Sequence, residues 1–164
     1  IVCALIVFVV RYSHISIMKF TITGNNLCSK KQRDPVTQNF LSQYVQTILY
    51  LRLQNYLFFG NANSLVDEIR RRLDQKEVIK YLIYNFKDVP GVDFSIISSF
   101  ERIKQLAINY NFQVVLTEMN ENIYSLFTKN GLISNEIKIL RYFSSYDAGI
   151  EWCEEDILTL KKKD

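Results

Sequence analysis

Short apolar runs alternate with longer segments of helical periodicity from residue 45 onward, and this alternation most constrains the fold. Strands that alternate with helices of about ten to fifteen residues form βαβ units, whose strands lie parallel in one sheet. The predicted strands are 48–53, 56–59, 78–86, 112–119 and 137–143, and the predicted helices are 61–75, 96–110, 120–131 and 144–160. The order ββαβαβαβα predicts an α/β fold with a mixed, mostly parallel sheet flanked by about four helices.

Local signals support these assignments. In the run 48–53, Leu49, Leu51 and Leu53 alternate with Ile48, Tyr50 and Arg52, as expected of a strand with two different faces. The run 56–59 follows after only two polar residues, so we expect an antiparallel hairpin there. Asn120 is placed to cap the helix 120–131, and Gly131 to end it.

Composition narrows the class of protein. The chain has 164 residues, of which 48% are hydrophobic and 23% charged, which is enough for one domain with a buried core. A net charge of +3, without a basic stripe between aromatic residues, gives no reason to expect a nucleic-acid partner. Three widely spaced cysteines and the single His14 suggest no disulfide framework, metal site or cofactor, and leave no usual general base.

The chain opens with ten apolar residues, about half of what a membrane-spanning helix requires. No basic segment precedes them and no cleavage site follows, which argues against a signal peptide. They are either a buried strand or the end of a transmembrane helix that begins outside this sequence. Basic residues after the run favour the second interpretation; they are Arg11, Lys19, Lys30, Lys31 and Arg33. We therefore expect a helix end at 1–10, a juxtamembrane linker at 11–44 and a domain at 45–164.

The stretch VPGVDFSIISSF, residues 89–100, places Asp93 and Ser95 on the turn between a strand and a helix. The serine invites three interpretations, which are catalysis, phosphorylation and helix capping. A phosphate would add about −1.5 to −2 charges at a helix N-terminus, which favours anions. Capping, which stabilises a helix by about 1 kcal/mol, is the simpler interpretation. Asp93 is expected to close the turn through bonds to the nearby backbone.

One glycine-containing turn, two charged runs and the single tryptophan are further candidates for a function. Gly60 and Asn61 are a candidate anion or nucleotide contact, although a phosphate-binding loop normally needs several glycines. The runs at 70–72 and 151–156 are expected to be solvated charged faces, with contact to lipid or to basic loops of a partner as the alternative. Trp152 is expected to be a core residue.

Three segments in this order resemble the STAS domain (sulfate transporter and anti-sigma-factor antagonist), in the form that ends SulP-type anion transporters. They are LRLQNYLFFGNANSL at 51–65, VDFSIISSFERIKQL at 92–106 and DAGIEWCEEDIL at 147–158. The resemblance covers about residues 45–160 and implies a STAS-like fold. It also implies a non-catalytic domain on the cytosolic side of a membrane protein, which packs against the transmembrane part and modulates transport.

The resemblance also suggests a switch. Ser95 lies where soluble relatives carry a phosphorylated serine, Asp93 matches their aspartate, and Phe94 and Ile96 belong to the partner-binding turn. Ile96 departs from the glycine usual in those relatives. The implied partners are the transmembrane domain of the same transporter, a second copy in a homodimer formed through the transporter, and a kinase or regulatory protein.

The sequence disfavours two other classes of function. A free-standing phosphoswitch of the anti-sigma-antagonist kind needs neither the apolar run nor the basic flank, so these two features disfavour it. A small enzyme is disfavoured because the one histidine is remote and no nucleophile–base pair is visible.

Overall fold

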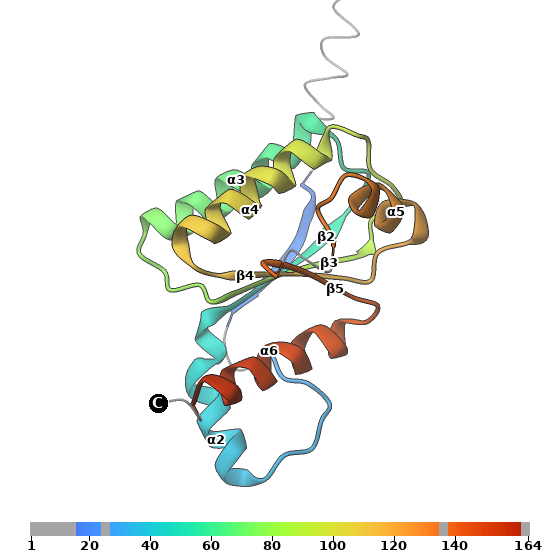
Figure 1. Ribbon diagram of the computed structural model, residues 1–164. Helices are drawn as coiled ribbons and strands as arrows, with labels where there is room; N and C mark the ends of the chain where they lie inside the picture. Colours follow the sequence, from blue (N-terminus) through green and yellow to red (C-terminus); the bar gives the residue numbers. More distant parts are fainter. Residues whose placement is uncertain (1–15, 24–26, 135–137, 162–164) are drawn as a thin grey trace, which may run out of the picture.

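The computed structural model describes residues 16–23, 27–134 and 138–161 (Figure 1). A five-stranded sheet has the order β1-β2-β3-β4-β5. Its strands are β1 (Met18–Thr23), β2 (Ile48–Gln54), β3 (Tyr81–Asp88), β4 (Gln113–Thr117) and β5 (Leu140–Phe143). β1 pairs antiparallel with β2, and the other neighbours pair parallel. The mixed, mostly parallel sheet predicted from the sequence is confirmed.

Helices cover both faces of the sheet. They are α2 (Pro35–Tyr44), a 3₁₀ turn (Val45–Thr47), α3 (Phe59–Asp74), α4 (Ile96–Tyr110), α5 (Glu121–Lys129) and α6 (Tyr146–Lys161). Figure 1 shows α3, α4 and α5 on one side of the sheet and α2 and α6 on the other. The described residues thus hold five α-helices rather than about four, because α2 lies in the stretch predicted as a linker.

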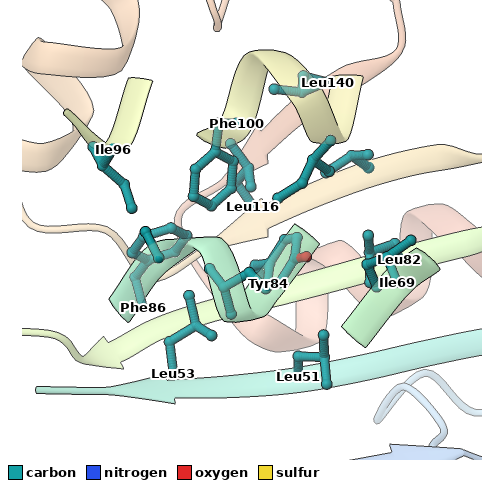
Figure 2. Packing of buried hydrophobic residues seen from close by; sticks show 14 of the residues in the cluster. Leu51, Leu53, Ile69, Leu82, Tyr84, Phe86, Ile96, Phe100, Leu116 and Leu140 are labelled. Carbon is teal, nitrogen blue, oxygen red and sulfur yellow. The ribbon is translucent and has the colours of Figure 1, made fainter. Parts of the chain in front are cut away.

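The core follows from the alternation in β2. Leu49, Leu51 and Leu53 are buried in the cluster under α3 and α4, whereas Ile48 and Tyr50 are buried in the cluster under α6. The two sets of alternating side chains in β2 therefore lie on opposite faces of the sheet, as the sequence predicts. Beneath α4, Tyr84, Phe86 and Phe127 pack around the Phe100 ring, with centroid separations of 5.4, 5.9 and 5.0 Å (Figure 2).

The predicted hairpin is wrong. Residues 56–59 form no strand, and the antiparallel partner of β2 is β1. Asn55 adopts a left-handed φ of 67° that turns the chain out of the sheet. Leu57 then makes an isolated parallel bridge with Val92, and helix α3 begins at Phe59. β3 pairs parallel with β2, so the chain must return to the start of the sheet through a crossover connection, which is α3. A hairpin after β2 would give an antiparallel neighbour instead.

The predicted linker at 11–44 is also wrong over two stretches, since it contains β1 and α2. Asp34 caps α2 by accepting the Thr37 amide at 2.9 Å, and Pro35 occupies the first turn. Proline is well tolerated there because the first helical amides have no partner within the helix. The predicted helix end at 1–10 lies outside the described residues. Within the described part of the chain, no helix combines the length and the apolar character needed to cross a bilayer.

Gly149 is required where α6 crosses β4. A β-carbon there would lie 2.8 Å from Thr117 Cγ2 and 3.1 Å from Val115 Cγ1. Alanine improves helix propensity by about 1 kcal/mol, but overpacking a core costs about 1–3 kcal/mol. We therefore expect Gly149→Ala to lower the free energy of unfolding by roughly 1 kcal/mol, measured by urea denaturation. Thr159→Ala, on the exposed part of α6, is the control and is expected to change it by less than about 0.5 kcal/mol.

Candidate functional site

Two loops that leave the carboxyl ends of β2 and β3 are joined by backbone hydrogen bonds. The Leu57 amide donates to the Gly91 carbonyl at 3.1 Å, and the Asp93 amide donates to the Leu57 carbonyl at 3.0 Å. A third bond links the side chain of Asn120 to the Pro90 carbonyl at 3.2 Å. The stretch from Pro90 to Ile96, called the Ser95 turn below, is therefore supported from two neighbouring loops.

Asp93 and Ser95 form the centre of the Ser95 turn. Asp93 Oδ1 accepts the Ser95 amide at 2.8 Å and also contacts the Ser95 hydroxyl. The predicted role of Asp93 in closing the turn is confirmed. Ser95 is the first residue before α4, as predicted, but its side chain makes no capping bond to that helix. Instead, Ser95 Oγ accepts the Phe59 amide, the first of α3, at 2.7 Å.

Ser95 therefore links two helix N-termini. The amides of a helix's first turn have no partner within the helix, and the helix dipole makes their end positive. At this point α3 presents the Phe59 amide to Ser95, while α4 begins one residue after Ser95. A negative group on this hydroxyl would meet favourable helix ends but also the carboxylate of Asp93, which lies within hydrogen-bonding distance.

The two loops that meet at Ser95 carry three exposed aromatic side chains. Tyr56, Phe59 and Phe94 are 49%, 54% and 68% exposed. Phe94 precedes Ser95, the Phe59 amide bonds to it, and the Tyr56 ring lies within 2.8 Å of where a β-carbon on Gly91 would be. These three side chains are called the aromatic patch below. Exposed aromatic groups of this kind are enriched in protein interfaces.

Two of the predicted site residues do not face a ligand or partner. Ile96, the first residue of α4, is fully buried in the core, so it cannot contact a partner directly. Asn61 is 3% exposed, and its amide accepts the Phe58 N–H at 2.9 Å and donates to the Tyr56 carbonyl at 2.9 Å. Its side chain therefore stabilises the start of α3 and is not presented to an anion. Gly60 lies beside it, in the exposed first turn of the same helix.

A second polar region, which the sequence did not predict as a site, lies at the carboxyl edge of the sheet. Arg52 binds Asp88 at 2.8 and 3.1 Å, and Lys19 binds the same carboxylate at 3.0 Å, so the Asp88 pKa falls to about 2. A cavity of about 430 Å³ adjoins Arg52, with Asn85 and Glu118 in its wall. Glu118 has a left-handed φ of 57°, and its carboxylate accepts the Asn85 amide at 2.5 Å.

The acidic run on α6 is only partly a solvated face, because its side chains pair with cations and one of them is buried. Glu154 is 5% exposed and binds Arg33 and Ser29, while Glu151 and Glu155 bind Lys31. Of the basic residues expected to mark a membrane flank, Lys31 and Arg33 are thus paired with α6, whereas Lys19 pairs with Asp88 of β3. On α3, Arg71 and Arg72 both bind Glu68 rather than facing solvent alone.

Trp152 lies on the inner part of α6. Trp152 is partly buried, with its ring 6.0 Å from that of Tyr81 and 4.7 Å from the Arg141 guanidinium, so it packs as predicted. Over the described residues, no group of three or more histidine, cysteine or acidic side chains could hold a metal ion. His14 lies outside the described residues.

Comparisons with known proteins agree with the fold and the order of these elements. The STAS domain family matches residues 40–147. The vacuolar basic amino acid transporter VSB1 of Saccharomyces cerevisiae is 31% identical over 161 residues, which covers 92% of this chain. The chain spans only 15% of the length of that protein.

Solved structures share the fold at low sequence identity. The murine Slc26a9 anion transporter in its inward-facing state is 14% identical, with a TM-score of 0.65, over 93% of this chain and 24% of that one. The STAS domain of a SulP transporter from Vibrio cholerae is 18% identical, with a TM-score of 0.50, over 65% of this chain and 85% of that one. The anti-sigma factor antagonist SpoIIAA in its unphosphorylated form is 12% identical, with a TM-score of 0.50, over 65% of this chain and 89% of that one.

Proposed function

Because the chain belongs to the STAS domain family, we propose that it is the non-catalytic regulatory domain of a SulP-type membrane transporter. It acts by binding the transmembrane part of the same protein through the Ser95 turn and the aromatic patch. The observation that carries this proposal is the exposure of three aromatic side chains in the two loops that meet at Ser95, whose hydroxyl joins two helix N-termini. Solvent-exposed aromatic groups next to a site that can gain charge suit a contact that is made and broken.

The setting of the domain follows from the same proposal. Its similarity to about one seventh of a yeast transporter supports a longer protein with membrane segments. In this setting the domain lies on the cytosolic side, in a homodimer formed through the transporter. The yeast relative is named for basic amino acids and the murine structure for anions, so uptake by the full-length protein must be compared for both solutes.

Phosphorylation of Ser95 would regulate the contact. The phosphate places about −1.5 to −2 charges beside the Asp93 carboxylate, which now accepts bonds from Ser95. Repulsion would turn Asp93 away and move Phe94, while the phosphate oxygens accept the Phe59 amide that now donates to the Ser95 hydroxyl. A kinase that recognises the exposed turn is therefore an expected partner.

Ser95→Glu and Ser95→Ala in the full-length transporter test this switch. We expect Ser95→Glu to change the transport rate several-fold, because it adds a charge next to Asp93, and Ser95→Ala to leave the rate close to that of the unmodified protein. Both changes are expected to alter the free energy of unfolding by only about 1 kcal/mol, the typical value of a cap.

Ser98→Glu is the matched control, since Ser98 is exposed three residues further along α4 and its hydroxyl bonds only to the Ser95 carbonyl. If Ser95→Glu transports like both Ser95→Ala and Ser98→Glu, the switch is wrong. The alternative function, a free-standing phosphoswitch, is favoured instead if the endogenous protein fractionates entirely with the cytosol.

A further inference from the structure

We propose that residues 27–34 form an ionic strap that locks α6 onto the sheet, and that opening the strap frees α2 and α6 together. This strap joins β1 to α2, and it contains no helix or strand of its own. Its apolar anchor is Leu27, which is 1% exposed. The inference concerns the face of the sheet opposite the Ser95 turn and does not depend on the proposed function (Figure 1).

The centre of the strap is a buried charge pair. Arg33 Nε and Nη2 donate to Glu154 Oε2 at 3.2 and 3.1 Å. The Ser29 amide and hydroxyl donate to the two oxygens of the same carboxylate at 2.9 and 2.5 Å. The side chains of Arg33 and Glu154 are only 8% and 7% exposed. Each charge is thus compensated only while the strap is closed, because opening leaves neither ion its partner.

Exposed pairs extend the contact along α6. Lys31 Nζ lies 2.8 Å from both Glu151 Oε1 and Glu155 Oε1, and Arg33 Nη1 lies 3.1 Å from Glu155 Oε1. The pKa of Lys31 is raised by its bonds to these two carboxylates, and the pKa of Glu155 is lowered by Lys31 and Arg33. The Lys30 amide also donates to Asp147 Oδ1 at 2.8 Å.

The strap and α6 depend on each other for electrostatic reasons. Asp147, Glu151 and Glu155 follow at intervals of four residues, which places three like charges on one face of α6. Such a row destabilises a helix unless it is neutralised. Here the strap supplies cations to Glu151 and Glu155 and a backbone amide to Asp147. The same exposed pairs are screened by salt, so ionic strength is expected to control how often the strap opens.

Hydrogen exchange measured by mass spectrometry on the full-length protein tests this proposal. Glu154→Gln keeps the shape of the side chain but removes its charge. We expect exchange to quicken at least tenfold in peptides from the strap, α2 and α6, while peptides from α3, α4 and α5 keep their protection. Raising the salt concentration from about 0.05 to 1 M is expected to quicken exchange in the same peptides of the unmodified protein.

Asp156→Asn is the matched control, because Asp156 lies on α6 but accepts the Tyr81 hydroxyl of β3 at 2.7 Å. Lys31→Gln, at an exposed position, replaces Glu154→Gln if the latter does not fold, and the same selective increase of at least threefold is expected. The proposal is overturned if exchange does not change, if the strap alone changes while α6 stays protected, or if all helices lose protection equally.

Discussion

Replacing Phe100 with alanine is expected to lower the free energy of unfolding by about 3–5 kcal/mol. Phe100 is fully buried on α4, where its ring packs against Tyr84 and Phe86 from β3 and Phe127 from α5 (Figure 2). These contacts join three elements of the larger core. Truncation removes apolar contact area and leaves a cavity that the rigid strand β3 cannot close, and both effects destabilise the fold.

Urea denaturation of the purified domain measures this loss, and the melting temperature should fall by about 10 °C or more. Phe94→Ala is the matched control, since the same chemical change is made at a side chain that is 68% exposed. The control is expected to stay within about 0.5 kcal/mol of the unmodified protein. A loss below about 1 kcal/mol for Phe100→Ala would contradict the described packing of this core.

The regular part of the fold was predictable because local patterns and tertiary structure agree there. The alternation in β2, the helical period of α4 and the cap at Asn120 each identify an element that the structure contains. β1 and α2 were missed because the polar residues around them resemble those of a linker. Asp34 and Pro35 do carry a helix-start signal, but it stands alone in a polar stretch without a sustained apolar period.

Of the site, only contacts between residues close together in the sequence could be predicted. Asp93 and Ser95 are two residues apart, so the turn between them could be inferred. The bond from Ser95 to the Phe59 amide joins residues 36 positions apart and depends on how α3 packs beside α4. The strap joins Arg33 to Glu154, which are 121 positions apart. The two runs of opposite charge were visible in the sequence, but no local pattern indicated that they meet.

The second large effect is expected at Phe94, because the account requires it to lie in an interface. An aromatic side chain at the centre of an interface commonly contributes about 2 kcal/mol or more to binding. Phe94→Ala should therefore weaken association of the domain with the transmembrane part about 30-fold, while the fold keeps its stability. Ile108→Ala, on an exposed side chain near the far end of α4, should leave the association unchanged.

The most direct measurement is photo-cross-linking in the full-length protein, with a benzophenone amino acid placed at position 94 or, as the control, at position 108. The account predicts that the adduct from position 94 maps to membrane segments of the same protein, within one chain or across its dimer, and that Ser95→Glu reduces its yield. Equal yields from positions 94 and 108, or no adduct with the transmembrane part from position 94, would contradict the claim that this surface binds it.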